Sequence, residues 1–399
     1  MRKSAVVVIH MQQNLSDIEW LYGSLATMDD KPLIPFAEET IEQLNALSVA
    51  LLRDPHARQY PDVMTFGFFC RKASLLKLKE QHSHTELRLG RGVVFHIAPS
   101  NVPVNFAYSM VAGLLAGNSN VVRVSQKNFP QVDIIVKHMR EIGMERVTVV
   151  RYTHESAANE AFSSKCDVRV IWGGDATIAT IRKNALPARA FDICFADRYS
   201  LAVINADKLM DEKDMDSLAM KFYNDTYLFD QNACSAPHLV VWLGATNSIA
   251  KAKEMFWSAL QRVVEQKYTF QDVMAVDKLT ALYRQAVAMH THAEEKKNNL
   301  LCRVSIDSLP TYIDAFRCAS GYFTEYTAES LDEIADIITR KYQTLAYYGF
   351  EKKELQDFVL RNCLTGIDRI VPFGDTTAFS LIWDGNDLIN IMSRVIDVK

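Results

Sequence analysis

The sequence contains no run of eighteen consecutive apolar residues, so we expect no helix that spans a membrane. It also has no block of five or more like charges, and 44 Lys and Arg residues nearly balance 48 Asp and Glu residues. This distribution provides no basic surface for nucleic acid or for a polybasic membrane contact, so an anionic ligand would need a local pocket. Repeats and low-complexity tracts are absent as well. With 49% apolar and 23% charged residues, the composition is that of a soluble globular protein.

The seven cysteines are widely spaced and odd in number, and no C-x-x-C pair occurs among them. These features disfavour both a disulfide framework and a zinc site, and they are typical of reduced thiols in a cytosolic protein. The N-terminal apolar stretch Ala5 to Ile9 is too short for a signal peptide, and no small-residue cleavage site follows it. We therefore expect a cytoplasmic protein in which this stretch forms a strand.

The length of 399 residues predicts two or three domains. From about residue 90, short β-branched runs alternate with amphipathic runs of helical length, which is typical of βαβ units on a parallel sheet. Pro103 suits the first turn of one helix, and Gly143 suits the left-handed end of a helix that begins at Pro130. The expected strands of this part are 92–98, 118–124, 146–150 and 167–172.

A strand at 199–205 and an amphipathic helix at 211–222 place a change of domain at about residue 198. A second α/β domain is expected over residues 199–375, with a strand at 238–243, and a C-terminal segment covers 376–399. The long helices of this second domain are predicted at 247–266 and 272–290. The first ninety residues are predicted to be mostly helical.

Gly173 and Gly174 follow a predicted strand and precede a helical run, where a phosphate could approach the backbone. An ordinary tight turn explains the same two glycines. The G-x-G-x-x-G pattern of common dinucleotide-binding folds is absent, so a cofactor would be held by a different kind of loop.

Cys234 differs from the other cysteines because it lies in a polar loop directly before a strand, at the predicted change of domain. Such a loop can expose a reactive thiol, whereas Cys166, Cys194 and Cys302 lie within or beside apolar runs and are expected in the core. His238, four residues further on, is a minor candidate for a base that activates the thiol.

Asn101 lies between a predicted strand and a proline-started helix, where its side-chain N–H could stabilise an oxyanion, although position alone favours a helix cap. The H-x-H pairs at His82 and His84 and at His290 and His292 have no cysteine or carboxylate cluster at the usual ligand spacing. A metal site is therefore disfavoured.

Several segments resemble the LuxC-type acyl-CoA reductases of the aldehyde dehydrogenase superfamily. They are GVVFHIAPSNVPVN (92–105), LLAGNSNVVR (114–123), DQNACSAP (230–237), GIDRIVPFG (366–374) and IWDG (382–385), while residues 1–90 match only loosely. The resemblance implies an aldehyde dehydrogenase-like fold of two doubly wound α/β domains with an active-site cleft between them. Residues 1–198 would then bind NADP(H), and residues 199–375 would carry the nucleophilic cysteine.

In this resemblance Cys234 is the nucleophile, and Asn101 forms the oxyanion hole together with the backbone N–H of Cys234. Arg123 falls where aldehyde dehydrogenases place a lysine beside the adenine ribose, and no acidic residue follows it closely. Arg123 and Lys127 therefore indicate NADPH rather than NADH. Gly173 and Gly174 take the place of a Gly-Ser turn that contacts the pyrophosphate. The implied cofactor-binding residues are Ala98, Pro99, Ser100, Arg123, Ser125, Lys127, Gly173 and Gly174, and no metal is implied.

The implied reaction is the NADPH-dependent reduction of an acyl-CoA, fatty acyl by the family's default, to an aldehyde through a thioester on Cys234. Hydrolytic aldehyde dehydrogenases carry a glutamate base before the change of domain, but residues 191–199 contain none. Water activation is then unsupported unless Asp192 or Asp197 replaces that base. The alternatives are an oxidative aldehyde dehydrogenase, an acyltransferase or thioesterase, and a non-reducing acyl-transfer subunit of a multienzyme complex. The resemblance leaves open whether the acyl donor is CoA, a carrier protein or an acyl-protein synthetase partner, and whether the chain forms a homo-oligomer.

Overall fold

The computed structural model describes residues 17–82, 86–294 and 297–399. The chain divides into two compact units, one running up to Ala196 and including Leu381–Lys399, the other comprising Asp197–Ser380. Residues 381–399 of the expected C-terminal segment thus belong to the first unit. The strand expected at Ala5 to Ile9 lies outside the described residues. Within the described parts of the chain, no helix has both the length and the apolar character needed to cross a membrane.

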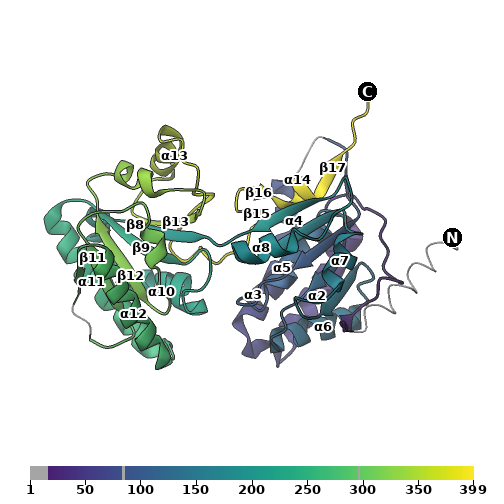
Figure 1. Cartoon of the computed structure of the whole chain (residues 1–399), viewed down its shortest axis with the longest axis horizontal. Coiled ribbons are helices and arrows are strands. Elements are labelled where there is room, and N and C mark those ends of the chain that lie inside the picture. Colours follow the sequence, from purple (N-terminus) through teal and green to yellow (C-terminus); the bar gives the residue numbers. More distant parts are fainter. Residues whose placement is uncertain (1–16, 83–85, 295–296) are drawn as a thin grey trace. The chain divides into compact units, whose positions relative to one another are not determined.

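The first unit is built on a six-stranded sheet in the order β1-β5-β4-β3-β6-β7. Figure 1 labels the helices that surround this sheet. The strands of the sheet are β1 (Glu19–Tyr22), β3 (Val93–Ile97), β4 (Ser119–Arg123), β5 (Val147–Arg151), β6 (Val168–Trp172) and β7 (Phe191–Phe195). Of these strands only β1 is antiparallel to its neighbour. The chain moves outward from β3 through β4 to β5 and then returns to the other side of β3 for β6 and β7. This reversal creates a topological switch point between β3 and β6, and open α/β sheets bind ligands at the carboxyl edge of such a point.

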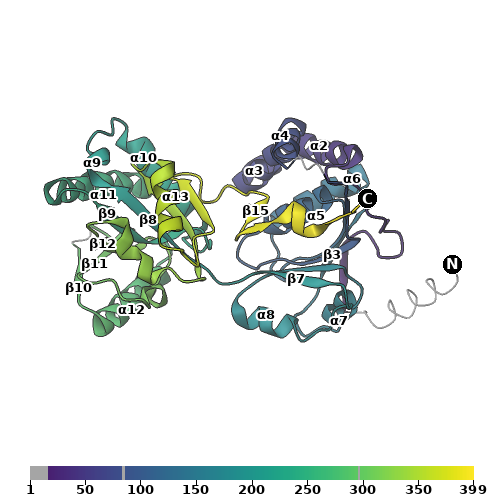
Figure 2. The same cartoon turned by 90° about the horizontal axis from the view of Figure 1, so that it is seen from above.

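Helices cover both faces of this sheet (Figure 2). One face carries α2 (Glu38–Arg53), α3 (Pro61–Phe69), α4 (Lys72–Gln81), α5 (Asn105–Leu115) and α6 (Pro130–Ile142), and the other carries α7 (Ala158–Ser163) and α8 (Asp175–Ile181). Phe162 and Ile178, from the second group, pack in one core cluster with Phe95 of β3. The mostly helical segment that was predicted within the first ninety residues is found at 38–81, where α2, α3 and α4 lie, whereas β1 and loops precede it in the described part of the chain.

Proline and glycine predicted the ends of one helix of this unit correctly and the start of another less well. α6 begins at Pro130 and ends before Gly143, whose left-handed φ of 77° was expected. α5 begins at Asn105 rather than at Pro103, because the Asn105 N–H closes a turn onto the Val102 carbonyl. The last residues of the chain form β15 (Ile382–Trp383), β16 (Asn386–Asp387), α14 (Leu388–Met392) and β17 (Ser393–Val395), which pairs with β2 (Arg88–Gly90).

The second unit contains a seven-stranded sheet in the order β10-β11-β12-β9-β8-β13-β14. Its strands are β8 (Tyr199–Asn205), β9 (Pro237–Leu243), β10 (Thr291–Ala293), β11 (Cys302–Ile306), β12 (Tyr322–Thr327), β13 (Tyr342–Tyr348) and β14 (Arg369–Pro372). Of these, β10 alone pairs antiparallel with its neighbour. The helices are α9 (Ala206–Leu209), α10 (Met215–Thr226), α11 (Thr246–Lys267), α12 (Val273–Ala288) and α13 (Lys352–Arg361).

Two core clusters flank this second sheet. Phe222 of α10 and Phe256 of α11 belong to one cluster, and Leu355 of α13 belongs to the other. The helix predicted at 211–222 begins at Met215, because the Asp214 carboxylate caps it by accepting from the Ser217 N–H. Each unit therefore has a mainly parallel sheet with helices on both faces, and the predicted doubly wound architecture is confirmed.

Candidate active site

Cys234 is exposed and lies in a turn directly before β9. The Ala236 N–H closes this turn onto the Ala233 carbonyl at 2.9 Å. The Ser200 hydroxyl, on β8, donates to the Cys234 carbonyl at 2.7 Å and accepts from the Thr344 N–H of β13 at 3.1 Å. The backbone of the cysteine is thus tied through one hydroxyl to two central strands. This arrangement presents an exposed thiol on a fixed backbone.

Gln231 holds the other end of the same loop. Its side chain is buried, with 1% of the residue exposed, and makes four hydrogen bonds to backbone groups. The amide nitrogen donates to the carbonyls of Pro237 and Tyr322, and the amide oxygen accepts from the N–H groups of Gly321 and Tyr322. Asp230 and Gln231 both have positive φ, at 52° and 60°, a conformation that side chains other than glycine adopt only at a cost. The four hydrogen bonds offset that cost and fix the loop.

The other cysteines are less suited to nucleophilic chemistry. Cys70, Cys166 and Cys302 are buried, and burial raises the pKa of Cys166 to about 12. Cys194, expected in the core, is only half-buried, and burial raises its pKa as well. Cys363 is the other exposed thiol and lies just after α13. Exposure therefore distinguishes Cys234 and Cys363 from the remaining five.

His238 is a poor candidate for the base that activates Cys234. Its ring is buried and stacks on Tyr199 with centroids 5.7 Å apart, and its Nδ1 lies 3.1 Å from the Cys318 carbonyl, so this nitrogen carries the proton. Burial lowers the pKa of His238 to about 4. A group that is so difficult to protonate is a weak base near neutral pH.

The predicted cofactor-binding residues of the first unit gather at the carboxyl edge of its sheet. Residues 98–100 follow β3, and Gly173 and Gly174 follow β6. Arg123 is the last residue of β4, and Ser125 lies in the loop after it. Lys127 lies in the same loop as Ser125, whose hydroxyl accepts from the Lys127 N–H. Asn101 is exposed in the loop between β3 and α5. The structure therefore brings these residues to the carboxyl ends of three neighbouring strands, β4, β3 and β6, of which the last two border the switch point, while Cys234 lies in the other unit.

Two features of this edge fit a nucleotide. The Arg123 guanidinium lies 5.0 Å from the centre of the Tyr152 ring and donates to the Tyr152 carbonyl, but its Nε is buried without a partner among the described residues. A buried donor of this kind needs an acceptor, which a ribose hydroxyl or phosphate oxygen would provide. At Gly174, an added Cβ would meet nothing within 4 Å, and its φ of −67° does not require glycine. Open space at this backbone position lets a ligand approach closely.

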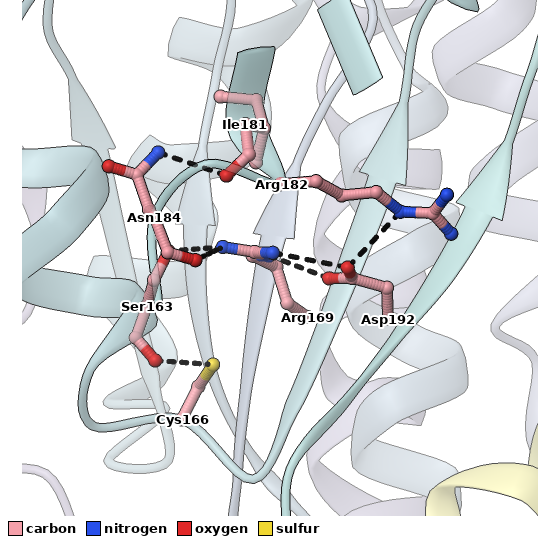
Figure 3. A network of polar contacts seen from close by, with 7 residues as sticks. All are labelled: Ser163, Cys166, Arg169, Ile181, Arg182, Asn184 and Asp192. Carbon is pink, nitrogen blue, oxygen red and sulfur yellow. Dashed lines mark hydrogen bonds and ion pairs between the residues drawn. The ribbon is translucent and has the colours of Figure 1, made fainter. Parts of the chain in front are cut away.

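Asp192, one proposed substitute for the missing glutamate base, is occupied by a structural ion pair (Figure 3). Arg169, with 1% of its side chain exposed, donates to both carboxylate oxygens of Asp192 at 2.7 and 3.1 Å. The same guanidinium donates to the Ser163 hydroxyl and the Asn184 carbonyl, and Arg182 lies 3.4 Å from Asp192. Asp192 is the second residue of β7, near the amino edge of the sheet and away from the edge described above. It therefore fixes the packing of β6 and β7.

Asp197, the other proposed substitute, is also paired. Both of its carboxylate oxygens accept from the Arg317 guanidinium, at 2.6 and 2.7 Å. Lys341 lies 3.8 Å away on the same carboxylate. Both oxygens of this carboxylate are therefore already engaged as acceptors. Neither aspartate is thus placed to act as an efficient general base.

Asp225 is a buried residue of the second unit that the sequence analysis missed. Its carboxylate accepts from the Gly374 N–H and from both the N–H and the hydroxyl of Thr376. Burial raises the pKa of Asp225 to about 6, despite these donors. The aspartate anchors the turn at the end of segment 366–374 to α10, and its position on the buried face of an amphipathic helix was the available clue.

Comparison of the sequence with known proteins identifies its relatives. The family profile described as Acyl-CoA reductase (LuxC) matches residues 68–395. The long-chain acyl-protein thioester reductase of Vibrio harveyi is 23% identical over 301 residues, which are 72% of this chain and 60% of that protein. The long-chain acyl-protein thioester reductase of Aliivibrio fischeri is 24% identical over 161 residues, which are 39% of this chain and 32% of that protein. The matches thus span no more than 60% of these relatives' lengths.

Solved structures resemble the chain over most of its length. A variant of 1-pyrroline-5-carboxylate dehydrogenase from Thermus thermophilus gives a TM-score of 0.63 at 12% identity, covering 90% of this chain and 80% of that one. Lactaldehyde dehydrogenase from Escherichia coli gives 0.59 at 11% identity, covering 84% and 78%. A Thermus 1-pyrroline-5-carboxylate dehydrogenase with bound NAD gives 0.58 at 12% identity, covering 87% and 75%. The predicted aldehyde dehydrogenase-like fold is confirmed.

Proposed function

The chain belongs to the LuxC family of acyl-CoA reductases, and we propose that it reduces an acyl thioester to an aldehyde through a covalent thioester on Cys234. The observation that carries this proposal is the exposed Cys234 thiol on a loop that Ser200 and Gln231 hold at both ends. A nucleophile on a fixed backbone loses little entropy when it meets a bound carbonyl, and the covalent intermediate that it forms divides one difficult step into two easier ones.

The first half of the reaction needs only residues of this chain and the thioester. The Cys234 thiolate attacks the carbonyl carbon, the C–S bond to the donor breaks, and the departing thiolate takes up a proton. Asn101 and the backbone N–H of Cys234 are the proposed donors to the oxyanion that forms between these two events. The product of this half-reaction is an acyl group on Cys234 and the free donor thiol.

The second half needs a hydride, which bound NADPH supplies. Ala98, Pro99, Ser100, Arg123, Ser125, Lys127, Gly173 and Gly174 are the residues proposed to hold this cofactor. The buried Arg123 Nε without a partner and the open space at Gly174 support the assignment. Arg123 and Lys127 supply positive charge, which favours the 2′-phosphate of NADPH over NADH.

The acyl group on Cys234 is proposed to pass to a thiol or to be reduced, rather than to be hydrolysed. Asp192 and Asp197 are both held by arginines, so neither is available to activate water at Cys234. A thioester that water does not remove survives until a thiol or a hydride reaches it. This favours a reductase that takes acyl groups from a thioester over an oxidative aldehyde dehydrogenase.

The donor is proposed to be a fatty acyl thioester, of CoA or of an acylated partner protein. Support for the second source is the name of the Vibrio harveyi relative, a long-chain acyl-protein thioester reductase. An acyl-protein synthetase would be the corresponding partner. A small thioester such as acyl-CoA is the simplest first substrate to test, because it needs no partner.

Intact-protein mass spectrometry with a panel of acyl-CoAs tests the proposal. Wild type should gain the mass of one acyl group, Cys234→Ala should gain none, and Cys363→Ala, which removes the other exposed thiol, should behave as wild type. NADPH should then discharge the adduct and release an aldehyde. An adduct that forms in Cys234→Ala would overturn the assignment of Cys234 as the nucleophile. An adduct that NADPH leaves in place would support a non-reducing acyl-transfer subunit instead.

A further inference from the structure

The second unit contains a cluster of potential metal ligands far along the chain from Cys234: His290, His292 and Asp307. The sequence analysis set the H-x-H pair aside because no carboxylate stands at ligand spacing near it. The structure supplies that carboxylate from the neighbouring strand. One ligand atom from each of the three residues lies within 4.8 Å of the others.

The strand pairing explains why the three side chains meet. β10 and β11 are antiparallel, with Thr291 opposite Ile306 and His292 opposite Ser305. Continuing this register by one residue places His290 opposite Asp307. Residues i and i+2 of a strand point to the same face, so both imidazoles and the carboxylate share one face of the hairpin.

The contacts agree with this register. The His290 Nδ1 lies 2.5 Å from one Asp307 oxygen, and the His292 Nε2 lies 3.0 Å from the other. The carboxylate therefore already sits between two imidazole nitrogens.

We propose that His290, His292 and Asp307 form a binding site for one divalent transition-metal ion of the zinc class. Two imidazole nitrogens and one carboxylate oxygen suit Zn²⁺ and its first-row neighbours, whereas Mg²⁺ and Ca²⁺ prefer oxygen ligands alone. Tetrahedral zinc holds its ligand atoms about 3.3 Å apart, so the present contacts need only small side-chain rotations. The ion would lie between the carboxylate and the two imidazole nitrogens, which now contact one another directly.

The surroundings set the coordination of the proposed site. The three side chains are 74%, 55% and 56% exposed, so an ion can reach them and water can complete its shell. Glu294 accepts from the Ser305 hydroxyl at 2.7 Å, so its carboxylate has a partner of its own. Three protein ligands with one open position is the expected arrangement. A bound ion would join β10, a three-residue edge strand, to the end of β11 and stabilise that edge.

The site is tested on untagged, chelator-treated full-length protein by equilibrium dialysis against Zn²⁺ with elemental analysis. Wild type should bind one equivalent, and the single variants His290→Ala and His292→Ala should each weaken this binding at least about tenfold. His154→Ala is the matched control, because His154 is 73% exposed and pairs with Glu155 in the first unit. The control should bind as wild type.

A second readout distinguishes this site from zinc bound by thiols. Co²⁺ replaces Zn²⁺ and should give visible bands without the near-ultraviolet absorption of cobalt bound to thiolate. Cys234→Ala and Cys363→Ala should keep the full Co²⁺ spectrum, and His292→Ala should lose it. The proposal is overturned if His290→Ala and His292→Ala bind Zn²⁺ as tightly as wild type, or if only the cysteine variants lose the metal.

Discussion

Gln231 and Tyr322 exchange two hydrogen bonds in which a side-chain amide takes the place of a neighbouring strand. The Gln231 Nε2 donates to the Tyr322 carbonyl at 3.1 Å, and the Tyr322 N–H donates to the Gln231 Oε1 at 3.2 Å. Because Tyr322 is the first residue of β12, the loop before β9 is joined to the start of a strand beside it. The position of Cys234 therefore depends on an amide three residues earlier.

Replacing Gln231 with Glu tests this dependence with almost no change in shape. The carboxylate would lose both donors and set an unpaired charge against the carbonyls of Pro237 and Tyr322, which should cost about 3 kcal/mol or more of unfolding free energy. Urea unfolding measures this cost, and acyl transfer to Cys234 should slow in the protein that remains folded. Gln266→Glu, at an exposed position of α11, should change neither quantity. Equal acylation rates for Gln231→Glu and wild type would contradict a positioning role.

How far the sequence predicted this molecule depended on how local each determinant is. The bounds of α6 follow from Pro130 and Gly143, which act within one turn, and both were predicted correctly. The bonds of Gln231 reach Gly321 and Tyr322, about ninety residues away, and pattern alone does not pair such distant positions. Asp307 was missed for the same reason, because only the register of β10 on β11 brings it to the histidines.

Acidification should destabilise the protein through two buried neutral histidines, His96 and His238. Burial lowers the pKa of each to about 4, against about 6.5 in an unfolded chain. Between these two pH values the unfolded state thus binds more protons than the folded state. The contribution of each neutral histidine to the unfolding free energy is therefore fully present above pH 6.5 and is lost as pH falls toward 4. At pH 5 each histidine should cost about 2 kcal/mol.

Urea unfolding at pH 7.5 and pH 5 measures the effect of His96. The ring bridges the Ser109 hydroxyl and the Asn120 side-chain oxygen, both at 2.7 Å, so His96→Gln keeps a polar group but removes the titration. This variant should be less stable than wild type at pH 7.5 yet lose about 2 kcal/mol less on acidification. An equal loss in both proteins would show that His96 does not titrate as its burial requires.

Arg123 should set the preference for NADPH. Replacing it with Met keeps an apolar stem against Tyr152 but removes the charge, which should raise the KM for NADPH about tenfold or more and leave the KM for NADH nearly unchanged. Steady-state kinetics with both cofactors measure the ratio. Lys137→Met, at an exposed position of α6, is the control and should leave both constants unchanged. A parallel rise for both cofactors would assign Arg123 to the shared part of the nucleotide instead.

Asp192→Asn separates a structural aspartate from a catalytic one. The substitution leaves the buried Arg169 charge without its counter-ion, which should lower the unfolding free energy by about 3–5 kcal/mol. Asp197→Asn breaks a pair whose side chains are each 35% exposed, and it should cost about 1 kcal/mol or less. If neither aspartate activates water, both variants should keep the wild-type rate of acyl-enzyme hydrolysis per folded molecule. A large fall in that rate for either one, at a temperature where the protein is fully folded, would identify the missing base and return the oxidative alternative to consideration.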